Sequence, residues 1–187
     1  MMLIAEQKKK ENIAEYILYM WQMEDLVRGS ELAIERVMTK IFPEYDPSDE
    51  MVAEYRGWFL DIIEEMKDSG LEKQGHLQTV KRHISMLSEL HQSLITAYQD
   101  KEYIDLYKKA VEDIRLLKSK SGSQSLSDVE VCLTGLYGLL LLRIQKASIS
   151  EETMQAMNRI GKVMAHLSES FKRYQSGELS FPPELNN

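Results

Sequence analysis

The apolar positions between Val129 and Lys146 (VEVCLTGLYGLLLLRIQK) cover nearly the whole circumference of a helix. A helix that is apolar on all sides is either buried on all sides or spans a membrane. A membrane span needs about 20 apolar residues, whereas this run is shorter and is interrupted by Thr134. We therefore predict that residues 129–146 form a central helix around which the other helices pack. Leu136 and Leu140, in its middle, should then be almost fully buried.

Apolar residues recur at helical spacing in most of the remaining chain, and no alternating strand pattern or fixed-period repeat is present. The segments with this spacing are 6–28, 30–41, 50–67, 76–98, 100–117 and 148–176. This pattern predicts an all-α fold, an irregular bundle of about six to seven helices around the helix at 129–146. We expect a single all-helical domain at 1–176, followed by an extended or disordered C-terminal tail at 177–187.

Several helix ends carry recognisable stop and cap residues. Gly29 should end the first helix, and Asp100 should cap the helix that follows it. Ser127 with Glu130 forms a capping box at the start of the apolar helix, and Ser148 is predicted to cap the last one. The Ser- and Gly-rich stretch 118–127 is the most linker-like part of the chain.

Composition and charge restrict the classes of function. The chain has 187 residues and a formal net charge of −7, which disfavours nucleic acid as a partner because phosphate binding needs a basic surface. Its single cysteine fits a reducing compartment, and the N-terminal MMLIAEQKKKEN does not resemble a signal peptide. We therefore expect a cytoplasmic protein that binds neither nucleic acid nor membrane. No phosphate loop, nucleophile elbow or dinucleotide fingerprint is present, so we expect no cofactor, and whether the chain is an enzyme stays open.

Glu24 is a carboxylate near the middle of an apolar helix face, with Asp25 at the edge of that face. A buried carboxylate must be hydrogen-bonded or ion-paired, since desolvation otherwise raises its pKa. A structural pair with Arg143 or Arg28 is the preferred interpretation. A functional acid and an exposed helix end are the alternatives.

Three histidines, His76, His83 and His91, share the apolar side of the helix at 76–98. Their spacing separates neighbours by two turns, roughly 10–12 Å, so one helix cannot chelate an ion through two of them. Core or interface histidines are the preferred interpretation, and no metal site is predicted. A metal or acid/base role would need a partner such as Glu24. The candidate buried polar cluster therefore consists of Glu24, Asp25, His83, His91 and Arg143.

An acidic segment extends from Glu44 to Glu72. It contains ten acidic and two basic residues, a net charge of −8, so that the rest of the chain carries +1. On the helix within this segment, the acidic side chains lie roughly opposite the apolar face. A solvated face is the preferred interpretation, and a docking face for a basic protein partner at residues 50–68 is the alternative.

Two further features concern helix packing. Gly135 and Gly138 lie inside the apolar helix, where each costs about 1 kcal/mol against alanine, which indicates close approach of another helix. The chain has eleven Met, two Trp and nine Tyr. This is more large side chains than the core of seven modest helices requires. The surplus predicts a self-complementary patch and a homodimer.

Three blocks of the sequence, IAEQKKKENIAEYILYMWQMEDLVR, EKQGHL and LYGLLLLRIQKASISEETMQA, resemble a bacterial family catalogued as domain of unknown function 4924. The resemblance covers nearly the whole chain apart from about the last ten residues. It implies a small all-helical cytoplasmic protein from Bacteroidetes-type bacteria, without an assigned activity. If the family has a site, the blocks implicate the eight residues within them that could take part: Trp21, Glu24, Asp25, Arg28, Gly75, His76, Arg143 and Lys146.

Two hypotheses of function follow. The first is a non-enzymatic helical protein-interaction module that self-associates. The alternative is a small-ligand or metal-dependent helical-bundle enzyme that uses Glu24 with His83 or His91. No reaction, ligand or partner can be named from the residues alone.

Overall fold

The computed structural model describes residues 4–43, 50–120 and 125–179. Within these ranges the chain forms eight helices and no strands, which confirms the predicted all-α class. The helices are α1 (Ile4–Glu11), α2 (Ile13–Arg28), α3 (Ile34–Ile41), α4 (Glu50–Asp68), α5 (Gln78–Thr96), α6 (Lys101–Lys120), α7 (Asp128–Ile144) and α8 (Glu151–Gln175).

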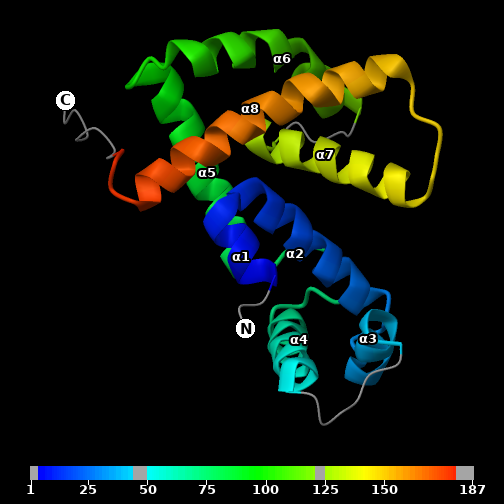
Figure 1. Cartoon of the computed structure of the whole chain (residues 1–187). Helices are drawn as coiled ribbons and strands as arrows, with labels where there is room; N and C mark the ends of the chain where they lie inside the picture. The colour runs from blue at the N-terminus through cyan, green and yellow to red at the C-terminus, as the bar shows by residue number, and fades with distance from the viewer. Residues whose placement is uncertain (1–3, 44–49, 121–124, 180–187) are drawn as a thin grey trace.

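The helix that connects the fold is α2. It packs against α1, α3, α4, α5, α7 and α8. Half of its residues are buried, including Ile17, Trp21 and Val27. Figure 1 shows α5–α8 gathered at one end of α2 and the α3–α4 pair at the other. Most contacts of α3 and α4 are with each other and with α2, and Glu65 of α4 also accepts a hydrogen bond from the N–H of Gln78 at the start of α5. The position of α2 therefore sets how the two groups of helices are placed.

The single helix predicted at 6–28 is in fact two helices that meet at Asn12. The backbone of Asn12 is extended (φ −155°, ψ 106°), and its side-chain oxygen accepts hydrogen bonds from the N–H groups of Ala14 and Glu15. Asparagine is among the best N-cap residues because its side chain satisfies these otherwise free donors. The cap separates α1 from α2 and accounts for the eighth helix.

The arrangement predicted for the apolar helix is not confirmed. The N-terminal half of α7 is buried, with Leu133 inaccessible and Val129 nearly so. Leu136 and Leu140 are only partly buried, so the prediction for these two residues is wrong. The reason is positional, because the C-terminal half of α7 reaches the edge of the bundle, where the connection to α8 begins (Figure 1).

The predicted caps are mostly confirmed. Gly29 is the C-cap of α2, Asp100 accepts from the N–H of Tyr103 at 2.9 Å, and Ser127 accepts from that of Glu130 at 3.2 Å. At α8 the prediction is two residues early, since Ser150 is the cap and accepts from the N–H of Thr153.

Parts of four sequence predictions lie outside the described residues. They are residues 1–3 of the predicted domain, 44–49 of the acidic segment, 121–124 of the predicted linker and 180–187 of the predicted tail. None of the helices in the described ranges is long and apolar enough to cross a lipid bilayer.

Candidate functional site

A buried carboxylate, Glu24, lies where α2 meets the start of α5. Its side chain is fully buried. Oε1 accepts a hydrogen bond from the N–H of Leu77 at 3.0 Å, and Oε2 lies 2.6 Å from Nδ1 of His76. Leu77 is the N-cap residue of α5, and its own side chain forms no capping hydrogen bond. Glu24 therefore supplies, from another helix, the acceptor that the start of α5 lacks.

A second carboxylate completes this junction. Oε1 of Glu65, on α4, accepts from the N–H of Gln78 at 3.0 Å. The first N–H groups of α5 are thus bound by carboxylates from α2 and α4. Negative charge at a helix N-terminus is favourable because the free N–H groups carry partial positive charge. The junction ties three helices together at one point.

Arg28 fixes the loop that leads into α5. Its side chain is 14% exposed, and Nε donates to the carbonyl oxygen of Leu71 at 3.1 Å. Another guanidinium nitrogen donates to the carbonyl oxygen of Gly75. Gly75 has φ +95°, in the left-handed region that favours glycine. Arg28 also donates to Oδ1 of Asp25 at 2.9 Å, while its separation from Oε2 of Glu24 is 3.9 Å.

Aromatic side chains extend the junction to α7. The indole of Trp21 stacks on the His76 imidazole, with ring centroids 4.6 Å apart, and meets the Tyr137 ring edge-on at 5.5 Å. The Tyr137 hydroxyl donates to Oδ2 of Asp25 at 2.6 Å. Burial raises the pKa of Tyr137, and the hydrogen bond to Asp25 raises it further. We call Trp21, Glu24, Asp25, Arg28, His76 and Tyr137 the Glu24 cluster.

The chemistry open to the Glu24 cluster centres on His76. With Nδ1–H donated to the Glu24 carboxylate, the imidazole is held in one orientation and Nε2 keeps its lone pair. The His76 side chain is 34% exposed. An imidazole held in this way can accept a proton or bind a metal. Within the described residues, no group of three or more His, Cys, Asp or Glu side chains is arranged to hold a metal ion.

The structure brings only part of the predicted polar cluster together. Glu24 and Asp25 are neighbours in it, but the histidine beside Glu24 is His76, not His83 or His91. His83 is bonded through Nδ1 to the carbonyl oxygen of Thr79 at 2.6 Å. Helical geometry explains the difference, because His76 precedes α5, beside its capped end, and the other two lie further along the helix.

Arg143 and Lys146 also lie apart from Glu24. A guanidinium nitrogen of Arg143 lies 3.9 Å from Sδ of Met154, on α8. Lys146 is exposed and follows the C-cap of α7. The sequence predicted Arg143 or Arg28 as the partner of Glu24, and of these two it is Arg28 that lies near Glu24, at 3.9 Å.

His91 belongs to a second, buried polar group between α5, α6 and α7. Its Nδ1 lies 2.6 Å from the hydroxyl of Tyr103, a fully buried residue. The hydroxyl of Tyr107 donates to Oδ2 of Asp128 at 2.5 Å. Burial lowers the pKa of His91 and raises that of Tyr103. These hydrogen bonds satisfy polar atoms inside the core, which agrees with the preferred interpretation of His91 as a core residue.

Cys132 lies in the same region, and its thiol should be inert in the folded protein. The residue is 2% exposed, and burial raises the pKa of its thiol to about 12. Because the thiolate is the reactive form, we expect no reaction with an aromatic disulfide reagent at pH 8 and full reaction after unfolding in urea. Stoichiometric labelling of the native protein within minutes would contradict this prediction.

The second candidate surface is apolar and lies on the C-terminal half of α7. Leu141, Leu142 and Ile144 are 36%, 38% and 60% exposed, and Leu136 and Leu140 are partly exposed beside them. We call these five residues the α7 surface. A cavity of about 420 Å³ opens between α2 and α7, and one of about 530 Å³ opens between α7 and α8.

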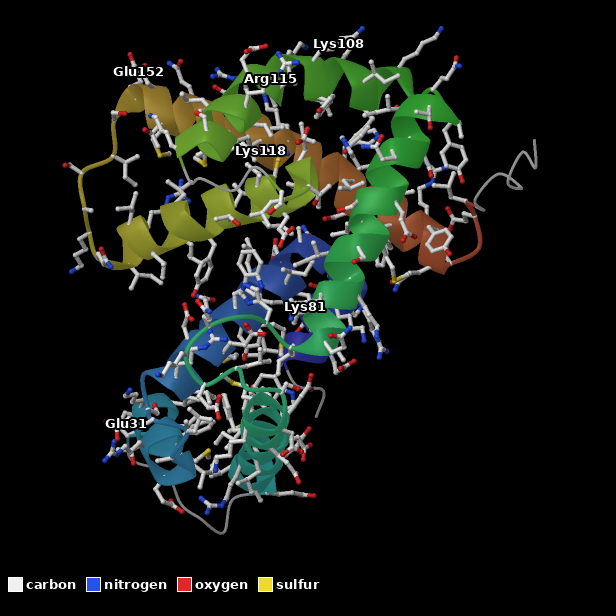
Figure 2. The ribbon with its side chains drawn as sticks, turned by 180° about the vertical axis from the view of Figure 1, so that it is seen from behind. Glu31, Lys81, Lys108, Arg115, Lys118 and Glu152 are labelled. Atoms are coloured by element: carbon white, nitrogen blue, oxygen red, sulfur yellow. The ribbon has the colours of Figure 1, made fainter. Side chains whose placement is uncertain are left out.

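The acidic and basic side chains lie mainly elsewhere. The acidic residues of α4 are exposed apart from the half-buried Glu65, as a solvated face requires. On the outer side of α6, Lys108 and Arg115 point to solvent (Figure 2). The α7 surface thus differs from these helices in presenting consecutive large apolar side chains.

Two parts of the Glu24 cluster could not have been found from sequence spacing. The first is the hydrogen bond between Tyr137 and Asp25, which are 112 positions apart in the chain. The second is the hydrogen bond from the backbone N–H of Leu77 to Glu24, because almost any residue type provides such a donor. The signal that was available is the carboxylate on an apolar face, because such a group requires a donor nearby.

Comparison with known proteins adds a family and no activity. No curated protein and no solved structure matches the chain. The family model described as "Domain of unknown function (DUF4924)" matches residues 2–178, nearly the whole chain and both candidate surfaces. The protein therefore belongs to the DUF4924 family, an uncharacterised domain family whose fold in this chain is entirely helical in the described residues.

Proposed function

We propose that this protein is a self-associating helical interaction module that pairs through the α7 surface. The observation that carries the proposal is the exposure of Leu141, Leu142 and Ile144, by 36%, 38% and 60%, on a helix that is apolar on all sides. Large apolar side chains left exposed favour association, because burying them removes apolar area from water.

The distribution of charge favours a second copy as the occupant. The strongly acidic segment 44–72 carries −8 and the rest of the chain +1. The helix of that segment, α4, packs on α3 and α2 and not on α7. The cavity between α2 and α7 is bordered by Lys8 and Arg143 as well as Glu15, charges of both signs. Two copies can therefore approach through their nearly neutral part without net repulsion.

The expected affinity is modest. Burying what remains exposed of three large side chains on each of two copies contributes roughly 4–8 kcal/mol. Loss of translational and rotational freedom costs about 4–15 kcal/mol. Contacts across the cavities that flank α7 must supply the difference, so we expect dissociation in the micromolar range.

The test is the mass of the protein in solution as a function of concentration. We expect sedimentation velocity and light scattering to give a dimer at about 100 µM and a growing monomer fraction on dilution. Leu142→Glu should give a monomer throughout. The matched control is Leu60→Glu on α4, a leucine of similar exposure (43%), which should dimerise like the wild type. A wild-type monomer at all concentrations would overturn the proposal.

A further inference from the structure

Four positions of α7 follow one another at intervals of four: Glu130, Thr134, Gly138 and Leu142. Lys146 comes four residues later, just beyond the C-cap Gln145, with a left-handed backbone (φ +53°). We call these five residues the row. None of the five is buried. Residues four apart form the ridges by which helices most often pack, and two such ridges interlock when the helices cross at about −50°. The row is symmetric in character about Gly138. Thr134 and Leu142 lie four residues before and after Gly138. Glu130 and Lys146, which carry opposite charges, lie eight residues before and after it.

Close packing among the described residues does not account for Gly138. A Cβ atom built there would meet nothing within 4 Å. The neighbouring Gly135 differs, since its Cβ would lie 2.8 Å from Cδ1 of Leu117 on α6. Close packing thus accounts for Gly135, as the sequence predicted, but not for Gly138. A glycine destabilises a helix interior relative to alanine. Gly57 on α4 and Gly161 on α8 are equally open, so Gly138 is distinguished by the uncharged cavity beside it and not by its openness.

The surroundings of Gly138 fit a large apolar side chain. Beside it opens a cavity of about 270 Å³, lined by ten residues without a charged one among them, including Leu142 and Met157. The hydroxyl of Thr134, also in the lining, donates to the carbonyl oxygen of Glu130 at 2.8 Å. Its hydrogen-bonding need is therefore met within α7, and its methyl group can face an apolar neighbour.

The ends of the row carry charges that have no ion-pair partner among the described residues. The ion pair at the start of α7 joins Asp128, and not Glu130, to Lys118 at 3.5 Å. Glu130 and Lys146 are of opposite sign, and each is eight positions from Gly138 in the sequence. If two copies of the row align in opposite directions about Gly138, each Lys146 comes level with the other copy's Glu130, and each Leu142 with the other copy's Thr134.

We infer that two copies pair by an antiparallel, two-fold crossing of α7 on α7 at Gly138. This inference rests on the proposed self-association and adds its geometry. In the crossing, Leu142 of each copy enters the uncharged cavity of the other, and Lys146 pairs with Glu130 of the partner subunit at both ends. Each contact occurs twice, as two-fold symmetry requires.

Charge reversal tests the crossing. Lys146→Glu alone places two acidic groups together at both ends of the dimer, and Glu130→Lys alone places two basic groups together. We expect each single variant to dimerise about tenfold or more weakly than the wild type. An equimolar mixture of the two single variants should form a heterodimer of about wild-type affinity, because both ends then pair opposite charges. The heterodimer also shows that both variants are folded.

Gly138→Ala gives an independent test, because it should raise the stability of the monomer and weaken the dimer. Alanine should raise the midpoint of thermal unfolding at low protein concentration, where monomer prevails, and weaken the dimer about tenfold by filling the space at the crossing. If the wild type dimerises but the mixed variants form no heterodimer, or Gly138→Ala dimerises normally, the crossing is wrong while the proposed function stands. A monomeric wild type would overturn the proposed function itself.

Discussion

Replacing Glu24 with alanine will lower the free energy of unfolding by about 3–5 kcal/mol, a large part of the stability of a typical domain. The change removes the acceptor of the Leu77 N–H and of the His76 imidazole, and a buried donor without an acceptor bears its full desolvation cost. Urea unfolding followed by far-ultraviolet circular dichroism measures this loss. Glu24→Gln should cost less, because its amide oxygen can still accept one of the two hydrogen bonds.

The matched control is Glu54→Ala. Glu54 is an exposed carboxylate on α4, and removing an exposed charge should change stability by only about 0.5 kcal/mol. The difference between the two variants therefore measures the junction of α2 and α5 rather than the general effect of losing a negative charge. Equal urea midpoints for the two variants would show that the Glu24 cluster does not hold the helices together.

Helix content could be predicted from the sequence because apolar periodicity is a local property. The segment predicted at 50–67 is observed as Glu50–Asp68, and that predicted at 76–98 as Gln78–Thr96. The missed break at Asn12 has a local cause as well. Apolar spacing continues across the cap, so the cap residue itself was the only signal of two helices.

Placement of the helices could not be predicted in the same way. The strongly apolar α7 was taken as the centre, whereas α2, with its polar Glu24 and Asp25, packs against most of the other helices. Hydrophobicity shows that a face must be covered, but it does not show whether the cover comes from the same chain or from another one. The excess of apolar side chains on α7 is the same feature that supports self-association.

The polar site was predicted in part. That Glu24 requires a donor follows from burial alone, and the structure supplies two. Which histidine provides one of them depends on the turn before α5, where Gly75 adopts a left-handed backbone and Arg28 fixes the loop carbonyls. Those contacts join residues more than forty positions apart, beyond what local spacing can indicate.

Alanine substitutions in the N-terminal half of α7 should lower the free energy of unfolding much more than those in its C-terminal half. Leu133 is fully buried, so Leu133→Ala leaves a cavity and should lower the free energy of unfolding by about 2–5 kcal/mol. Leu142 is 38% exposed, and in the monomer Leu142→Ala should cost only about 0.5–1 kcal/mol. Denaturation of both variants beside the wild type, at protein concentrations low enough to keep it monomeric, measures this difference.

The same pair of variants connects stability to association. When the folded state dimerises, the free energy of unfolding increases with protein concentration. Well above the dissociation constant, the increase follows the logarithm of the ratio of the protein concentration to that constant. The wild type and Leu133→Ala should therefore both gain stability with concentration, because Leu133 lies inside the monomer. Leu142→Ala should gain much less, since its contribution is made mainly between copies. If Leu142→Ala loses as much as Leu133→Ala at low concentration, its side chain is part of the monomer core and the α7 surface is not a free face.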